Sequence, residues 1–328
     1  MKELSLINLI KNKIQNSSDY IGDDTAYIEE LGIVITTDTL VEDVHFRLKN
    51  TTAFNLGFKS MAVNLSDIAS DGAIPAYAFV ALSLPKYVDE KFVEEFYDGM
   101  KELCVRHGVT IAGGDITSSE KLFINITLVG KTENLQPARR TNAKVGNIVI
   151  ATGFYGSSKA GFDILENKDK FENEFPVFIL NKFIKAHNKP EPHLGFGRII
   201  LQNSETTPAM MDTSDGLADA LFKIAQDSKV SMEIDSKLIP MDMDLKEIAN
   251  IMNADPLDYA LFGGEDYTLV ACVDEEAANK LAVKNIPIRK IGKVTAINEN
   301  GLVTIKTENS ELIIDQQVLE NKAFKHFN

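Results

Sequence analysis

The sequence is poor in cysteine, poor in cationic side chains relative to acidic ones, and free of long apolar runs. Its 328 residues include only two cysteines, Cys104 and Cys272, and neither belongs to a CxxC pair or a His/Cys spacing. We therefore expect neither a disulfide framework nor a structural zinc site. No apolar run approaches the ~20 residues that a membrane-spanning helix needs, and the first residues, MKELSLINLIKNKI, are too charged for a signal peptide. These absences predict a cytoplasmic protein that binds no membrane.

The charge balance is acidic. Lysine and arginine total 34 against 48 aspartates and glutamates, which gives a formal net charge of -14. Binding to a nucleic-acid backbone requires clustered cations, so we expect no nucleic-acid partner. The sequence also lacks a Walker A motif and the glycine-rich loop of protein kinases with its partner motifs. If this chain handles phosphates, it needs bridging metal ions and another way of binding them.

The chain does contain short acidic motifs, most of them with glycine, spread along its length. They are GDD (residues 22–24), TTDTLVEDVHF (36–46), NLSDIASDGA (64–73), GGDIT (113–117), DTSDGL (212–217) and GGEDY (263–267). Most of them follow an apolar run or border a helix, where open α/β folds bind ligands. Carboxylates that converge in one cleft repel each other unless cations lie between them. Hard oxygen ligands of this kind suit Mg²⁺ bound together with substrate phosphates.

The apolar pattern of the first half predicts a mixed α+β unit. Residues 33–37 read as a strand that ends on Asp38, and residues 53–71 as an amphipathic helix with Asn64, Asp67 and Asp71 along one polar seam. Further strands are expected at 76–84, 109–112 and 122–129, with a helix near 89–106 and GGDIT between the last two strands. The polar segment 131–147 reads as a connection to the second half.

The second half alternates apolar strands with helices. Strands are expected at 148–152, 209–212, 230–234 and 268–273 and within 288–305, and a helix with Leu217, Leu221 and Ile224 on one face follows the second of these. Residues 153–158, GFYGSS, could form a backbone nest for an anion or an ordinary turn. The chain length and this change of pattern favour two domains, residues 1–136 and 137–328.

Several candidate residues have a structural alternative. Ser214 or Asp215 could cap the helix that follows rather than bind a ligand. Arg140 could bind phosphate oxygens with its guanidinium or lie solvated at the surface. His45, between two apolar residues, could be a packed histidine. The residues alone leave these alternatives open.

Taken in order, the motifs resemble those of thiamine-monophosphate kinases, which share a superfamily with aminoimidazole-ribonucleotide synthetase and selenophosphate synthetase. The resemblance extends over nearly the whole chain. It departs from the usual family motifs at Asp43, where VEGVHF is typical, at Ile116, where GGDTT is typical, and at residues 144–147, where KPGD is typical. None of these departures removes a residue that the resemblance places in the chemistry.

The resemblance implies a two-domain aminoimidazole-ribonucleotide synthetase-like fold. In it, an N-terminal mixed-sheet domain forms a homodimer and is joined to a larger C-terminal α/β domain. It also implies ATP-dependent phosphorylation of thiamine monophosphate to thiamine diphosphate, with several Mg²⁺ ions and no general base or nucleophile supplied by the protein. The implied metal-site residues are Asp24, Thr36, Thr37, Asp38, Asp67, Asp115, Asp212 and Asp215. The implied ATP-site residues are Gly114, Asp115, Arg140 and Ser214, and the implied substrate contacts are His45, Glu265 and Phe324.

Two other functions fit the motifs less well. One is an ATP-using synthetase of the same superfamily, although the reactive N-terminal cysteine and glycine-rich lead-in of selenophosphate synthetases are absent from this sequence. The other is a divalent-ion or nucleotide-binding module without catalysis. Measuring ATP consumption with and without thiamine monophosphate separates the three.

Overall fold

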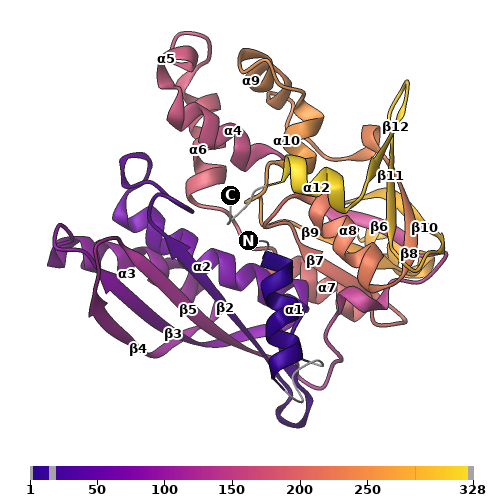
Figure 1. Ribbon diagram of the computed structural model, residues 1–328, viewed down its shortest axis with the longest axis horizontal. Coiled ribbons are helices and arrows are strands. Elements are labelled where there is room, and N and C mark those ends of the chain that lie inside the picture. The colour runs from indigo at the N-terminus through magenta and orange to yellow at the C-terminus, as the bar shows by residue number, and fades with distance from the viewer. Residues whose placement is uncertain (1–2, 15–19, 285, 324–328) are drawn as a thin grey trace.

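The computed structural model describes residues 3–14, 20–284 and 286–323. The chain forms two β-sheets, one in each half, with helices packed against them (Figure 1). This is the two-domain α+β architecture expected from the sequence. In the part of the chain described, no helix is both long and apolar enough to span a membrane.

The N-terminal half is built on a five-stranded sheet in the order β1-β2-β5-β3-β4. Strands β3 and β4 are parallel, and the other neighbours are antiparallel. The elements of this half are α1 (Glu3–Lys13), β1 (Ala26–Ile28), β2 (Ile33–Val41), α2 (Ala53–Ser70), β3 (Ile74–Leu84), α3 (Glu90–His107), β4 (Thr110–Ser118) and β5 (Phe123–Lys131). Helices α2 and α3 lie on one face of the sheet, as Figure 1 shows.

The C-terminal half is built on a seven-stranded sheet in the order β12-β11-β8-β10-β6-β9-β7. Only the β8–β11 pair is parallel among the strand pairs described. Its strands are β6 (Ile148–Thr152), β7 (Ala209–Asp212), β8 (Val230–Asp235), β9 (Leu269–Val273), β10 (Ile288–Ile297), β11 (Leu302–Lys306) and β12 (Glu311–Ile314). Its helices are α4 (Ser157–Glu166), α5 (Lys168–Phe171), α6 (Val177–Asn188), α7 (Leu194–Asn203), α8 (Leu217–Asp227), α9 (Leu245–Ile251), α10 (Pro256–Phe262), α11 (Glu275–Val283) and α12 (Gln316–Lys322).

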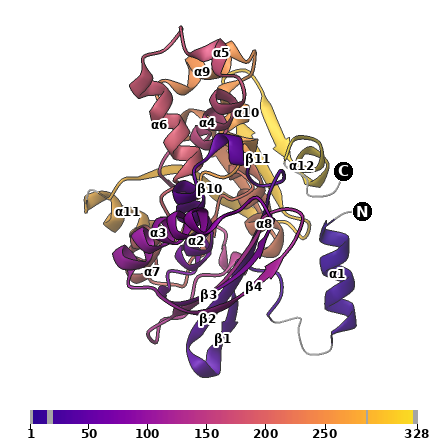
Figure 2. The same ribbon diagram turned by 90° about the vertical axis from the view of Figure 1, so that its left-hand side faces the viewer.

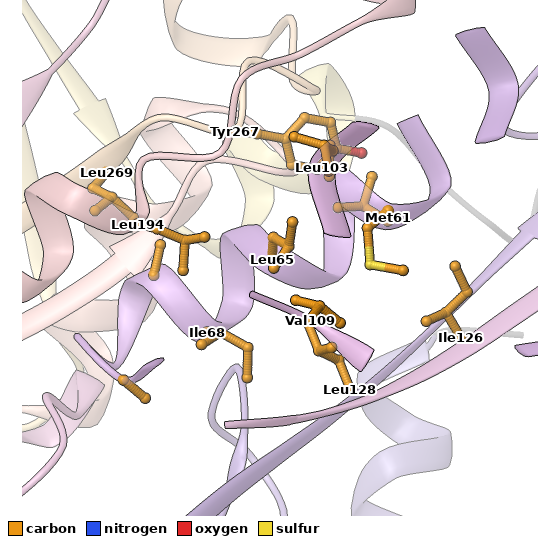
Figure 3. Close-up of a cluster of buried hydrophobic side chains, with 14 of the residues drawn as sticks. Met61, Leu65, Ile68, Leu103, Val109, Ile126, Leu128, Leu194, Tyr267 and Leu269 are labelled. Atoms are coloured by element: carbon orange, nitrogen blue, oxygen red, sulfur yellow. The ribbon is translucent and has the colours of Figure 1, made fainter. Parts of the chain in front are cut away.

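Helix α2 joins the two halves through one continuous apolar core. Its side chains Met61, Leu65 and Ile68 are fully buried and pack with residues of both halves, among them Leu128 of β5 and Leu269 of β9 (Figure 3). The apolar spacing predicted this helix, and Thr52 caps its start by accepting a hydrogen bond from the amide of Asn55. A helix buried on nearly every side holds its few polar residues in fixed positions, which matters for the site described below.

Two glycines allow α2 and α3 to pack backbone against backbone. A Cβ atom at Gly57 would lie 1.8 Å from the carbonyl oxygen of Phe96, and one at Gly99 would lie 1.9 Å from that of Phe54. No side chain fits at either position without moving the helices apart.

We expect Gly57→Ala to lower the free energy of unfolding by about 1–3 kcal/mol or more, the usual cost of overpacking a core. The matched control is Gly195→Ala in α7, because no neighbouring atom lies within 4 Å of a Cβ there. Alanine should be neutral or stabilising at Gly195, since it favours the helix. Urea unfolding of both variants tests this, and equal stabilities would contradict the packing described.

Two strand predictions were wrong in detail. Strand β2 does not end on Asp38 but continues to Val41, paired with β5 throughout. Beyond Ile35 no described strand pairs with its other edge, and the Asn64 side chain accepts the hydrogen bond of the Asp38 amide there, 3.2 Å away. The GGDIT motif is not a connection but the middle of β4. Gly114 lies so close to β3 that a Cβ would be 1.9 Å from the Val80 carbonyl oxygen, so the glycine accommodates a strand rather than a ligand.

On the side of the five-stranded sheet opposite α2 and α3 lies α1, drawn apart from the strands in Figure 2. The exposed side chains of this sheet face include Tyr77 and Phe79 of β3 and Phe123 of β5, each between 41% and 45% exposed. The view in Figure 2 shows α2 and α3 on the opposite side of the same strands. An open sheet face with several aromatic residues is unusual for a monomer.

Candidate active site

Three aspartates from distant segments converge between the two halves. Oxygen atoms of Asp24, Asp67 and Asp212 all lie within 4.8 Å of one another. Asp24 precedes β1, Asp67 lies in the last turns of α2, and Asp212 is the last residue of β7. We call these three residues the aspartate cluster.

Neighbouring hydroxyl groups fix the orientation of the aspartate cluster. Thr36 donates a hydrogen bond to Asp67, and Ser66 donates one to Asp212 at 2.6 Å. Ser214 donates another to Asp212 at 3.1 Å, from the turn between β7 and α8. The carboxylates are therefore positioned by the protein before any ligand binds.

Burial and mutual repulsion oppose ionisation of these carboxyl groups. The pKa of Asp212 is raised to about 7 by burial and then by the charge of Asp24. Burial, followed by Asp24 and Asp215, raises the pKa of Asp38 to about 6. The pKa of Asp67 is raised well above its usual value by burial and by Asp38. Carboxyl groups this close together are all ionised only when cations bind between them.

The donor set fits a divalent cation. One oxygen of Asp24 is buried without a hydrogen-bond partner among the described residues. All the candidate ligands are oxygen atoms, the type that Mg²⁺ prefers, and the guanidinium that contacts the aspartate cluster, that of Arg140, is paired with Asp24 and Asp23. Arg140 thus lies against the aspartate cluster rather than solvated at the surface, with its side chain only 13% exposed.

A cavity of about 710 Å³ adjoins the aspartate cluster. Asp38 and Asp67 line it on one side, and Ser214 and Asp215 line it from the loop before α8. His45 also lines it and is half-buried, with its Nδ1 atom accepting a hydrogen bond from the Val41 amide at 3.0 Å. His45 is thus neither a packed core histidine nor a surface one.

Glu265 reaches the same cavity from a strained turn. Gly264 and Glu265 both have left-handed backbone conformations, with φ of 68° and 56°, and the Glu265 amide donates to the Ser214 carbonyl at 2.7 Å. Left-handed φ at a non-glycine residue costs about 1–2 kcal/mol, so the surrounding structure must hold it there. The strain places the carboxylate against the cavity, 2.8 Å from the Lys59 ammonium.

Several cavity residues were missed from the sequence. Lys59 of α2, Lys159 and Phe162 of α4, and His187 of α6 all line the cavity. Lys59 could have been noticed, because it lies two helical turns before Asp67 on the same side of α2. The contribution of α4 and α6 depends on the tertiary packing of the second half, and no local pattern indicates it.

The glycine-rich turn GFYGSS does bind an anion, but the anion belongs to the protein. The carboxylate of Asp266 accepts hydrogen bonds from the amides of Gly156, at 2.6 Å, and Ser158, at 2.9 Å. The idea of a free nest for a ligand was therefore wrong. The turn instead fixes the GGEDY segment that carries Glu265.

Comparison with known proteins identifies the family. Residues 22–132 match the AIR synthase related protein N-terminal domain, and residues 144–304 match the corresponding C-terminal domain. The chain is 35% identical to the thiamine-monophosphate kinase of Bacillus subtilis (strain 168), with all of both chains covered. It is 34% identical to that of Aquifex aeolicus (strain VF5), over 99% of this chain and 98% of the relative. The chain belongs to the thiamine-monophosphate kinase family.

A solved structure agrees with this assignment. The structure described as AaThiL complexed with AMPPCP and TMP has a TM-score of 0.84 to this chain at 33% identity, over 99% of this chain and 97% of the other. One departure from the family motif has a structural explanation. Asp43 replaces the usual glycine and has φ of 64°, a conformation that glycine adopts freely and aspartate tolerates.

Some residues that the family motifs imply lie away from the aspartate cluster in a single chain. Thr37 points to the open face of the sheet, where its hydroxyl accepts a hydrogen bond from Asn125 at 3.1 Å. Gly114 and Asp115 lie on β4, three strands from β2, which is about 14 Å at the usual strand spacing. Phe324 falls outside the described residues. The functional roles of these four residues stay predictions.

Proposed function

We propose that this chain catalyses the ATP-dependent phosphorylation of thiamine monophosphate to thiamine diphosphate. The observation that carries the proposal is the position of the aspartate cluster beside the cavity, since Asp67 belongs to both. A cation-binding site next to a cavity of this size suits a reaction in which a phosphorylated small molecule accepts a phosphoryl group. Steady-state release of ADP with and without thiamine monophosphate tests the proposal. An ADP release rate that is the same in both cases would contradict it.

We propose Mg²⁺ as the metal, held by Asp24, Asp67 and Asp212. In addition to burial, the charge of Asp38 raises the pKa of Asp67, and the charges of Asp24 and Asp215 raise the pKa of Asp38, so Asp38 and Asp215 lie near the aspartate cluster. We propose them as additional ligands. Thr36 orients Asp67 by its hydrogen bond. When bound, the ions would neutralise the negative charge that builds up as two polyanions approach each other.

The acceptor needs no base from the protein. A phosphate monoester oxygen is already ionised at neutral pH, so it can attack the γ-phosphorus of ATP directly. The contribution of the chain is then to bind both molecules, align them and exclude water. Arg140 and Ser214, both beside the aspartate cluster, are proposed to bind the phosphates of ATP.

His45 and Glu265 are proposed to bind the acceptor, and this gives a prediction. We expect His45→Asn to raise KM for thiamine monophosphate more than it lowers kcat, because a binding contact is lost while the aligned phosphates are untouched. Incubation with γ-labelled ATP alone should leave no label on the protein, since transfer is direct. Covalent label on the wild-type protein that His45→Asn abolishes would show that His45 is a phosphoryl carrier instead.

We also propose a homodimer formed through the open face of the five-stranded sheet. A second copy would cover Tyr77, Phe79 and Phe123, and it would bring the side of the sheet that carries Thr37 and Asp115 into the interface. This would explain how Thr37 serves the metal site and Asp115 the metal and ATP sites, although both lie away from the aspartate cluster of their own chain. Light scattering of wild type and Phe79→Glu tests the dimer: the variant should be monomeric and should bind ATP more weakly than wild type.

The proposed domain division places the boundary near residue 136. It falls in the connection between β5 and β6, the last strand of one sheet and the first of the other in chain order. The cytoplasm remains the proposed location, on the sequence grounds given above.

A further inference from the structure

A buried lysine with spare hydrogen-bonding capacity lines the cavity. Lys59 is 3% exposed, and its ammonium lies 2.8 Å from one oxygen of Glu265. Apart from this ion pair, the ammonium has no hydrogen-bond partner in the described part of the chain. A lysine ammonium has three N–H donors, and leaving them unpaired in a buried site is costly. A ligand bound in the cavity that Lys59 lines would supply the missing hydrogen-bond acceptor.

The paired carboxylate is held as an anion and is fixed in place. Burial alone would raise the pKa of Glu265, but Lys59 and then His187 lower it overall. His187 lies 3.5 Å from the second carboxylate oxygen and shares a 3.1 Å contact with Ser158. Burial and the Lys59 charge lower the pKa of His187 to about 3, so this imidazole is neutral at physiological pH. The cavity therefore presents an ammonium donor and a carboxylate acceptor side by side.

Lys59 is separated from the aspartate cluster along α2. Lys59 and Asp67 are on the same side of α2, eight residues apart, which is about 12 Å along the helix axis. A phosphate accepting a phosphoryl group must lie at the metal end, so it cannot also reach Lys59. The part of the acceptor farthest from its phosphate is what meets Lys59 and Glu265.

The walls beside this pair suit a flat ring. Leu56 and Val63 of α2 line the cavity beside Lys59, and Phe162 also lines it, with its ring centroid 5.6 Å from that of His187. Apolar and aromatic walls around a few fixed polar groups are the usual composition of a small-molecule site.

We propose that Lys59 and Glu265 together recognise the hydrogen-bonding edge of the acceptor's aminopyrimidine ring. The ammonium of Lys59 donates to a ring nitrogen, and the carboxylate of Glu265 accepts from the adjacent exocyclic amine. An adjacent donor and acceptor can form two hydrogen bonds with such an edge, as the side-chain amide of asparagine or glutamine does with adenine in DNA. The inference rests on the proposed function for the identity of the acceptor and extends it to the residues that select it.

The test compares two acceptors that differ only at this edge. In the second, a carbonyl replaces the exocyclic amine, so the ring nitrogen carries a proton and the donor–acceptor order is reversed. Calorimetry with wild-type protein, without nucleotide, should show thiamine monophosphate binding at least ~10²-fold more tightly than the oxo analogue, because mispaired buried groups strongly reject an analogue. Equal affinities would overturn the inference, and this comparison requires no variant.

The variants assign the selectivity to residues. Lys59→Met keeps the length of the side chain and should reduce the preference for the amino form by at least ~10-fold, the scale of losing one good base-edge contact. Lys159→Met is the matched control, since Lys159 lines the same cavity but pairs with Asp163, and it should keep the preference. An unchanged preference in Lys59→Met would contradict the role of Lys59. Because binding is measured without ATP, discrimination without phosphoryl transfer would overturn the proposed function and leave this inference standing.

Discussion

Asparagine at any one of Asp24, Asp67 or Asp212 is expected to lower kcat by at least ~10²-fold at saturating Mg²⁺, the scale of removing one preorganised electrostatic group from an active site. The three residues come from distant segments, yet their oxygen atoms lie within 4.8 Å of one another. They should therefore fail in the same way, with loss of turnover rather than loss of the fold. Near-normal activity in all three variants would show that the aspartate cluster does not serve the reaction.

Stability measurements separate this result from misfolding. The raised pKa of Asp212 means that its ionised form destabilises the fold at neutral pH, so Asp212→Asn should leave the thermal midpoint of the metal-free protein unchanged or higher. Mg²⁺ should raise the midpoint of wild type more than that of the variant. Asp98→Asn, an exposed change on α3, is the matched control and should alter neither activity nor the effect of Mg²⁺.

Unphosphorylated thiamine is expected to be a poor substrate, with kcat/KM at least about 10³-fold below that of thiamine monophosphate, since a site built for a polar group strongly rejects an analogue that lacks it. Its hydroxyl group is not ionised at neutral pH and would have to lose a proton in order to attack, which a phosphate oxygen does not. The free alcohol also lacks oxygen atoms for the metal end of the cavity. Both features follow from a site that aligns two phosphates.

Parallel steady-state assays with the two acceptors check this prediction. Thiamine can also be tested as an inhibitor, because it still carries the aminopyrimidine ring that Lys59 and Glu265 are proposed to bind. It should therefore inhibit weakly and competitively against thiamine monophosphate. Comparable efficiency with both acceptors would contradict direct attack by a phosphate oxygen.

Much of the fold could be predicted because local patterns agree with it. The apolar spacing of residues 53–71 predicted α2 almost to the residue, and apolar runs located β2, β3 and β5, although β2 extends further than predicted. The errors arose where tertiary contacts override a local signal. Asp38 looked like a strand end, but the Asn64 side chain satisfies its backbone within β2. GGDIT looked like a loop, but Gly114 lies against a neighbouring strand.

The site was predictable only in part, for the same reason. The resemblance to a family supplied Asp24, Asp67 and Asp212 together, which no spacing in one sequence could do. Strand alternation could have separated Thr36 from Thr37, since adjacent residues of a strand face opposite sides. The position of Lys59 on α2 was a usable signal, but its pairing with Glu265 was not, because the partner comes from another segment. His187 was out of reach because the packing of α6 against the cavity is tertiary.

The most direct test of the central claim follows the phosphorus atom that moves. ATP carrying ¹⁸O at its γ-phosphoryl oxygens is incubated with the protein, Mg²⁺ and unlabelled thiamine monophosphate. The masses of the products are then measured by mass spectrometry. Phosphoryl transfer from ATP to this acceptor predicts thiamine diphosphate whose terminal phosphate carries the full label, with unlabelled ADP in equal amount. Labelled inorganic phosphate without labelled thiamine diphosphate would show that the protein hydrolyses ATP and does not phosphorylate this acceptor.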